Sequence, residues 1–220
     1  MNSLKRQLEE TQAASLRRST PERTAVFESA TEQLRLSGVE GRALPVGAQM
    51  PEVALSDAMG EQVSLRELNA RAPLVIVFYR GGWCPYCNLA LREWQRLMPD
   101  LVRCGGRLVA ISPQGPDQTL STAEKNELAF TVLSDTELVA AKSFGVAFTL
   151  ATDVVELYSQ LGVDLPSINA NGRWELPISA TFVIDREGRV AFAHVEADYR
   201  QRAEPSEVLA IVEALPKAAS

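Results

Sequence analysis

The chain has 220 residues, of which 46% are hydrophobic and 23% are charged, so it holds enough apolar material for a substantial core. Its net charge of −6 argues against nucleic acid or an anionic membrane surface as a main partner. The sequence shows no secretory signal, and no apolar run approaches the roughly 20 residues of a membrane helix, so we expect a cytoplasmic protein.

Residues 1–41 are expected to form a helical extension. A first helix carries only a weak apolar stripe, at Leu4 and Leu8. A second helix is expected from Thr20-Pro21, because a hydroxyl cap and a proline in the first turn favour a helix start. Its apolar stripe is clearer and consists of Val26, Phe27, Ala30 and Leu34. Two interpretations stay open: the extension packs on the rest of the chain, or it forms a homodimer contact.

Residues 42–220 are expected to form the main domain. It begins with a loop-rich entry, with short strand signals on either side of a turn at Met59-Gly60. Further strands are expected at Leu74–Tyr79, Arg107–Ser112, Phe130–Leu133, Ala180–Ile184 and Val190–Val195. Helices are expected at 85–102, 117–127, 136–144, 152–161 and 205–215. The alternation predicts an α/β fold with three layers, α/β/α, around a central mixed sheet, and the turn at Asp185–Gly188 predicts a closing hairpin.

The first buried strand leads into the segment Trp83-Cys84-Pro85-Tyr86-Cys87 at the start of a helix. Two thiols at this spacing can close a small disulfide ring. A helix N-terminus favours the thiolate, because its unpaired backbone N–H groups and its dipole stabilise negative charge. The thiolate is the nucleophile in disulfide exchange and in attack on peroxide. We therefore expect Cys84 and Cys87 to form a redox centre, with no metal and no cofactor.

Three other residues receive less weight. A zinc site at the cysteine pair is disfavoured, because it needs two more ligands and the chain offers only His194 and Cys104. We expect His194 to be a hydrogen-bonded strand residue. Cys104 is expected to be a small, half-buried residue at the far end of the helix, more than about 20 Å from the pair.

Together these features resemble the thioredoxin fold and, within it, the peroxiredoxin-like family of alkyl hydroperoxide reductases and thiol-specific antioxidants. The resemblance covers about residues 42–216 and is carried by 47–51, 53–57, 75–87, 109–114, 133–135, 144–146 and 180–188. It implies a thiol-dependent peroxidase that reduces hydrogen peroxide or organic hydroperoxides. A thioredoxin- or glutaredoxin-type protein would then supply the electrons. Residues 151–178 look like an insertion able to wall the site.

The resemblance places Cys87 at the position of the peroxidatic cysteine. Cys84 then stands where the family has a threonine, and Arg80 where it has a proline. The family's distant arginine would fall at Ser179. Those groups position peroxide and polarise its O–O bond, so the chain departs from the family pattern where the chemistry occurs. Arg200 and Arg202 could replace the missing arginine, although we expect their loop to be solvated.

Two other functions remain open. Trp-Cys-x-x-Cys is also typical of thioredoxin-like thiol–disulfide oxidoreductases, in which Cys84 would be exposed, low in pKa and attacking, and Cys87 would resolve. That class carries a cis-proline where this chain has Ser179. In the peroxidase arrangement Cys87 attacks and Cys84 resolves. The third function is a redox-sensing binding module, with a partner contact switched by the disulfide.

Residues next to the pair are candidates for shaping the substrate site. Arg80 would lower a thiol pKa as a neighbouring cation, or it is a solvated turn residue. Trp83 and Tyr86 would form an apolar lip, or they pack in the ordinary way.

Overall fold

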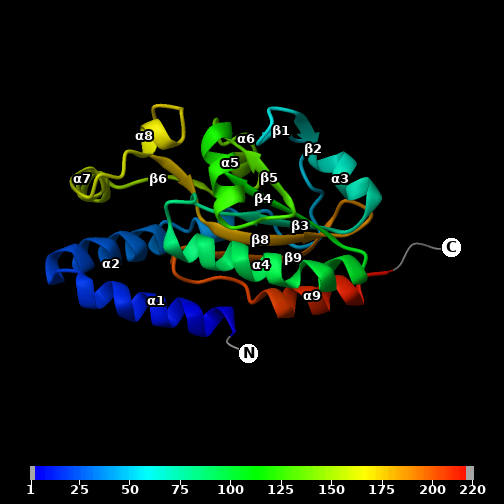
Figure 1. Ribbon diagram of the computed structural model, residues 1–220, viewed down its shortest axis with the longest axis horizontal. Coiled ribbons are helices and arrows are strands. Elements are labelled where there is room, and N and C mark those ends of the chain that lie inside the picture. The colour runs from blue at the N-terminus through cyan, green and yellow to red at the C-terminus, as the bar shows by residue number, and fades with distance from the viewer. Residues whose placement is uncertain (1–2, 217–220) are drawn as a thin grey trace.

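The computed structural model describes residues 3–216; the ends of the expected extension and domain, residues 1–2 and 217–220, lie outside them. Two helices, α1 (Leu4–Arg18) and α2 (Pro21–Leu36), and a short 3-10 helix, η1 (Glu40–Arg42), precede the sheet (Figure 1). Ser3 and Thr20 cap the two long helices as hydrogen-bond acceptors. The expected helical extension is therefore present, with its second helix starting at the predicted proline.

The centre of the described chain is a seven-stranded mixed sheet with the order β2-β1-β5-β4-β3-β8-β9. Its strands are β1 (Ala54–Asp57), β2 (Gln62–Ser64), β3 (Leu74–Phe78), β4 (Arg107–Ser112), β5 (Thr131–Ser134), β8 (Ser179–Ile184) and β9 (Val190–Glu196). β3, β4 and β5 run parallel, whereas β8 pairs antiparallel with β3 and forms the predicted hairpin with β9. The expected mixed sheet is confirmed.

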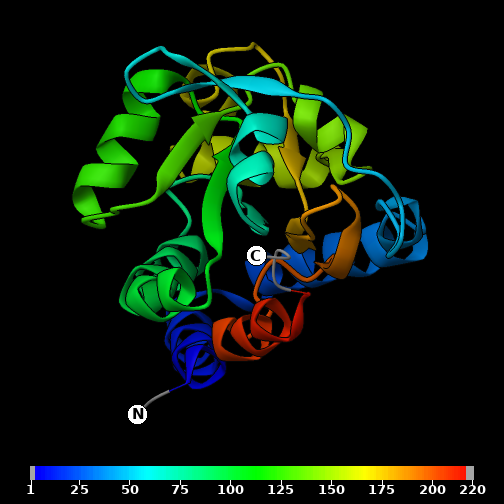
Figure 2. The same cartoon turned by 90° about the vertical axis from the view of Figure 1, so that its right-hand side faces the viewer.

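Helices cover both faces of the sheet, which confirms the predicted three layers. The helices are α3 (Leu65–Arg71), α4 (Pro85–Arg103), α5 (Pro116–Lys125), α6 (Val139–Ser143) and α9 (Pro205–Ala214). Alternate residues of β3 enter two different cores: Val75 and Val77 pack with α4 and α9, and Ile76 and Phe78 pack with α6 and the start of α3. Figure 2 shows α4, α9 and α1 grouped on one side of the sheet.

Two local features differ from the sequence expectation. The strand signal after Met59-Gly60 ends at Ser64, which caps α3 instead of continuing the strand. The helix expected from residue 136 begins only at Val139. Leu138 is left-handed (φ 57°), and the Asp135 carboxylate accepts the backbone N–H groups of Ala140 and Ala141.

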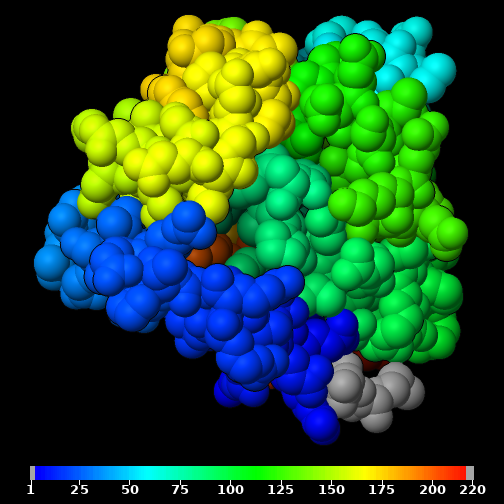
Figure 3. Space-filling view, turned by 60° about the vertical axis from the view of Figure 1, so that its left-hand side comes forward, coloured from blue at the N-terminus to red at the C-terminus, as the bar shows by residue number. Residues whose placement is uncertain are grey.

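The expected insertion forms a separate layer at one end of the sheet. It contains α7 (Thr152–Gln160) and α8 (Leu165–Ile168), with β6 (Ala147–Thr149) before them and β7 (Glu175–Pro177) after them. β6 and β7 pair antiparallel, a small sheet that the sequence did not predict. Figure 3 shows α2 beside α7 on one face of the molecule.

The extension packs on the rest of the chain, as one of the two interpretations expected. Leu4 and Leu8 are buried in the core that contains α4, and Glu204 accepts the backbone N–H groups of Leu4 and Lys5. Phe27 of α2 packs its ring against Tyr158 of α7, 5.7 Å between centroids. No helix within residues 3–216 is long and apolar enough to cross a membrane.

Candidate active site

Cys84 and Cys87 lie where β3 has ended and α4 begins. Cys84 is the N-cap residue of α4, and its carbonyl accepts the N–H groups of Cys87 and Asn88 at 3.1 and 3.2 Å. Cys87 lies in the first helical turn, where backbone N–H groups and the helix dipole favour a thiolate. Both residues are buried, with 1% and 0% of their surfaces exposed.

The two thiols have different electrostatic environments. Burial raises the pKa of Cys87, but a hydrogen bond from Cys84 and the charges of Arg202 and Arg80 outweigh it and hold that pKa well below its ordinary value. The same thiol–thiol hydrogen bond, together with burial, raises the pKa of Cys84 well above its ordinary value. The pKa of Cys87 is therefore the lower of the two, and the environment of the pair favours the thiolate form at Cys87.

Arg202 reaches the thiols from the loop between β9 and α9. Its Nη2 donates to Cys87 Sγ at 3.2 Å, and its Nη1 donates to the carbonyl of Tyr199 at 2.6 Å. The expectation that this loop is solvated is wrong for Arg202. Arg200 does not approach the thiols in this way, because the Asp198 carboxylate accepts its Nε at 2.7 Å and its Nη2 at 3.0 Å.

Arg80 is buried beside the pair, so the interpretation of a solvated turn residue is also wrong. Its side chain is enclosed by aromatic rings: the guanidinium carbon lies 4.5 Å from the ring centre of Tyr199, 4.9 Å from that of Trp83 and 5.9 Å from that of Tyr158. Its Nη2 also donates to the Tyr158 hydroxyl. The aromatic faces stabilise the cation without supplying a negative charge.

The other expected site residues surround Arg80 and the thiols. Trp83 is half-buried and meets the ring of Tyr158 edge-on at 5.6 Å. Tyr86 is buried, and its ring meets Tyr199 edge-on, also at 5.6 Å. Ser179 begins β8, and its hydroxyl is buried with no hydrogen-bond partner in the described chain. The peptide bonds of residues 3–216 are all trans, so no cis-proline opposes the pair.

A buried polar network that sequence reasoning missed holds the loop before Cys84. The Gln114 side-chain carbonyl accepts the N–H of Gly82 at 2.7 Å and the hydroxyl of Thr122 at 3.2 Å. Asn88 donates to the carbonyl of Gly82 at 2.8 Å and accepts from Asn126 at 3.0 Å. The one available signal was Gln114, which closes a segment that carried the family resemblance.

The less favoured residues take no part in the thiol pair. Cys104 follows the last turn of α4, at the far end of that helix from Cys84. We expected His194 to be a hydrogen-bonded strand residue. It lies in β9, but its Nε2 is buried and has no hydrogen-bond partner among residues 3–216. Within the same residues, no group of three His, Cys, Asp or Glu side chains is placed to hold a metal ion.

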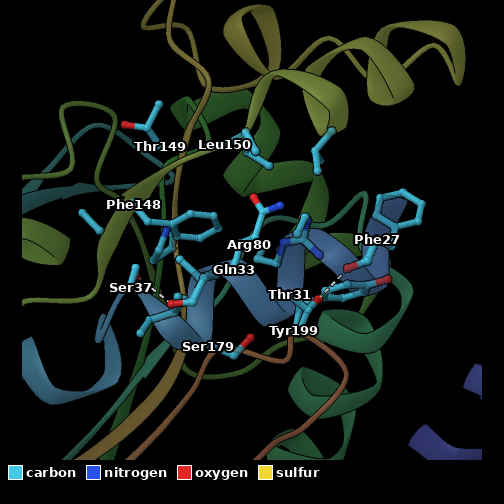
Figure 4. Close-up of a pocket in the computed structure, with 18 of the residues that line it drawn as sticks. Phe27, Thr31, Gln33, Ser37, Arg80, Phe148, Thr149, Leu150, Ser179 and Tyr199 are labelled. Carbon is cyan, nitrogen blue, oxygen red and sulfur yellow. Dashed lines mark hydrogen bonds between the residues drawn. The ribbon is translucent and has the colours of Figure 1, made fainter. Parts of the chain in front are cut away.

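A cavity of about 460 Å³ lies next to the thiols, between α2, the insertion and the start of β8. Figure 4 shows Arg80 extending into the middle of it, with Ser179 and Tyr199 below and Phe148 to one side. Arg80 and Tyr199 belong both to the cavity wall and to the surroundings of the cysteines. The expectation that the insertion walls the site agrees with this geometry, since Ala151, Val154 and other residues of 151–178 line the cavity.

Comparison with known proteins agrees with this architecture. The sequence model of the AhpC/TSA family matches residues 46–193. Peroxiredoxin Bcp of Escherichia coli is 33% identical over 103 residues, 47% of this chain and 65% of that protein. The chloroplastic peroxiredoxin Q of Sedum lineare is 28% identical over 120 residues, 54% of this chain and 63% of that protein. The chain thus matches just under two thirds of the length of either relative.

The fold is also found in solved structures. The crystal structure of peroxidoxin BcpB from Mycobacterium tuberculosis superposes with a TM-score of 0.63 at 21% identity, covering 79% of this chain and 99% of that one. At this level of identity the superposition shows a shared fold, which is of the thioredoxin type. Because the family's sequence model matches more than half of the chain, the protein belongs to the AhpC/TSA family of peroxiredoxins.

Proposed function

We propose that the protein is a thiol-dependent peroxidase in which Cys87 attacks the peroxide and Cys84 resolves the product. One arrangement carries the proposal: Cys87 lies in the first turn of α4, accepts hydrogen bonds from Cys84 and Arg202, and is the thiol with the lowered pKa. Thiolate character governs the reactivity of cysteine toward peroxide. Membership of the AhpC/TSA family supports the same reaction class.

The proposed catalytic cycle has three steps. The Cys87 thiolate attacks one oxygen of ROOH, the O–O bond breaks, and with one proton the products are Cys87–SOH and ROH. The Cys84 thiol then condenses with the sulfenic acid, which forms the Cys84–Cys87 disulfide and releases water. A thioredoxin- or glutaredoxin-type dithiol reduces that disulfide and is itself oxidised to a disulfide.

Arg202 would take over part of the role of the family's distant arginine, although it comes from a different segment. Its Nη2 lies beside the Cys87 sulfur, where a guanidinium stabilises the thiolate and favours the negative charge that develops on the leaving oxygen. Arg80 adds a second positive charge close to the thiols. These two cations support peroxide chemistry at a site where Cys84 and Arg80 stand in place of the family's threonine and proline.

The thiol–disulfide oxidoreductase alternative receives less support. That mechanism needs an exposed Cys84 of low pKa, whereas Cys84 is 1% exposed and its pKa is raised. A small peroxide needs much less access than a protein disulfide. We also propose that the start of α4 opens when the disulfide meets its electron donor, because both sulfurs are buried.

Rapid mixing of the reduced protein with stoichiometric hydrogen peroxide tests the assignment. Tryptophan fluorescence is the signal, because Trp83 adjoins the cysteine pair. Cys87→Ser should abolish the fast phase. Cys84→Ser should keep it and accumulate a sulfenic acid that a dimedone-type reagent traps. Cys104→Ser is the matched control and should behave as the unmodified protein.

A reaction no faster than that of a free thiol would refute the peroxidase proposal. Loss of the fast phase in Cys84→Ser, with retention in Cys87→Ser, would reverse the assignment of the two cysteines. Stoichiometric oxidation without multiple turnovers, whichever dithiol donor is added, would favour the redox-sensing module.

A further inference from the structure

The cavity between α2, the insertion and β8 has a lining of distinctive composition. Its walls are mainly aliphatic and aromatic, and they contain no aspartate and no glutamate. Two cations belong to the lining: Arg42, which is exposed, and Arg80, which is 4% exposed. Figure 4 shows Arg80 pointing into the space between Phe148 and Tyr199. Among the described residues, the cavity lining is thus mainly apolar, and its charged side chains are both cations.

Arg80 has no carboxylate partner among residues 3–216. The groups around its guanidinium are the rings of Trp83, Tyr158 and Tyr199 and the two thiols. Arginine cannot shed its proton in a protein, and a buried charge without a counter-ion is costly. A thiolate at Cys87 does not neutralise the charge of Arg80, because Arg202 already donates to the Cys87 sulfur. Two guanidinium groups then face one negative charge.

Two buried polar atoms beside the cavity also lack partners. Arg80 Nε and Ser179 Oγ make no hydrogen bond within the described chain, and Ser179 is 2% exposed. Both residues line the cavity. Buried polar atoms are usually satisfied, so two unsatisfied atoms in residues that line the same cavity indicate a group that accepts hydrogen bonds there.

We propose that this cavity binds an amphiphilic monocarboxylate, whose carboxylate pairs with Arg80 and accepts from Ser179. The apolar body would lie along Phe27, Phe148 and Leu150, where aromatic rings favour a ligand that carries a ring. A carboxylate supplies the single negative charge and the acceptor oxygens that Arg80 lacks. This binding involves no redox step and goes beyond the proposed peroxidase function.

The proposal also gives the helical extension a role. Phe27, Ala30, Thr31 and Leu34 of α2 line the cavity, opposite residues of β6, α7 and β8. The half-buried apolar stripe of α2 therefore forms one wall of the ligand site as well as packing on α7. A ligand would be held between the extension and the main domain.

Isothermal titration of the reduced protein, without peroxide, tests the proposal with three probes: phenylbutyrate, its neutral analogue phenylbutanamide, and acetate. We expect phenylbutyrate to bind roughly tenfold tighter than the amide, the difference between a charge-assisted and a neutral hydrogen-bonded contact. Acetate should bind far more weakly, because it lacks the apolar body. Equal affinities for phenylbutyrate and the amide, or no binding of phenylbutyrate, would overturn the proposal.

Substitutions of lining residues test where the ligand binds. Arg80→Gln should abolish the preference for the carboxylate, whereas Arg42→Gln, which removes an exposed cation of the same lining, should keep most of that preference.

Ala30→Trp should fill the cavity from α2 and block the binding of phenylbutyrate. This second test remains valid if Arg80→Gln fails to fold. Ala25→Trp, at an exposed position of α2, is its control and should bind normally. Unchanged binding in Ala30→Trp would refute this location. Because no peroxide is used, these outcomes are independent of the peroxidase proposal.

Discussion

The guanidinium groups of Arg202 and Arg80 approach the buried Cys87 thiol from two segments far apart in the chain. Arg202 donates directly to the sulfur, and Arg80 acts through its charge. In a buried site such charges have large effects, because little solvent screens them. At the residue scale, the pKa of Cys87 therefore depends on a side chain 115 residues away in sequence.

Arg202→Gln should slow oxidation of Cys87 by hydrogen peroxide about tenfold at pH values below the pKa of Cys87, the effect of a pKa change of about one unit. Arg202 holds the pKa of Cys87 down, so its loss should move the pH midpoint of the reaction upward. The rate requires the thiolate and falls as pH drops through that pKa. Stopped-flow rates measured across pH give both quantities.

Arg200→Gln is the matched control, because Arg200 is paired with Asp198 and does not contact Cys87. It should leave the midpoint in place. An unchanged midpoint in Arg202→Gln would show that Arg202 does not stabilise the Cys87 thiolate.

At the scale of elements, the loop between β3 and α4 is held from a neighbouring strand connection. Gln114 follows β4, and its side chain accepts the N–H of Gly82 and the hydroxyl of Thr122 of α5. Gly81, with φ of 143°, cannot take a Cβ without meeting the Trp83 ring. The thiol pair is thus positioned by β3, β4 and α5 together.

Gln114→Leu should lower the free energy of unfolding by about 1–3 kcal/mol, because it leaves the partly buried N–H of Gly82 without an acceptor. Urea denaturation measures this. Gln118→Leu, at an exposed position of α5, is the control and should change stability by less than about 0.5 kcal/mol. Equal losses in the two variants would contradict a specific role for Gln114.

Glu204 should hold α1 on the domain. Its carboxylate accepts the first N–H groups of α1, at 3.2 Å from Leu4 and 3.1 Å from Lys5, and a negative charge there also favours the helix dipole. Glu204→Ala should cost about 1 kcal/mol and speed hydrogen exchange in Leu4–Arg18. Glu204→Gln retains an acceptor and should have a smaller effect. Unchanged exchange in both variants would show that the hydrophobic contacts of α1 suffice.

At the scale of the whole molecule, the chain is a three-layer domain, and the extension and the insertion pack against its outside. α1 packs on α4, α2 packs on α7, and the two additions meet over the end of the sheet where the thiols lie (Figures 1 and 3). A consequence is that the cavity is built from three separate parts of the chain.

Stability should fall in mild acid because of His194, the one histidine of the sequence. Burial lowers its pKa below the ordinary value of 6.5. Between that value and the lower folded pKa, the unfolded chain binds more protons, so stability is full above pH 6.5 and is lost as pH falls toward the folded pKa. Urea unfolding at several pH values should show a slope below about 1.4 kcal/mol per pH unit.

His194→Phe removes the titrating group and should flatten this part of the pH dependence. A curve parallel to that of the unmodified protein would assign the loss of stability to other groups.

The sequence by itself determined the sheet, most of its helices and the cysteine pair. The physical reason is that these features are local: strands and helices follow from apolar periodicity and caps within a few residues, and Cys84 and Cys87 lie next to each other on one helical turn. The small β6–β7 sheet escaped prediction, because strands of three residues carry too little periodic signal. The late start of α6 depends on one left-handed residue and one carboxylate.

Only the tertiary structure decided which cation reaches Cys87, how Arg80 is buried, and what Ser179 faces. The expectations for Arg202 and for His194 as a hydrogen-bonded residue failed for the same reason: exposure and partners depend on contacts between distant segments. The order of the two thiol pKa values also depends on such contacts, because both cysteines sit at one helix start and only their different neighbours separate them. Local sequence therefore located the cysteine pair, and long-range packing set the electrostatics around it.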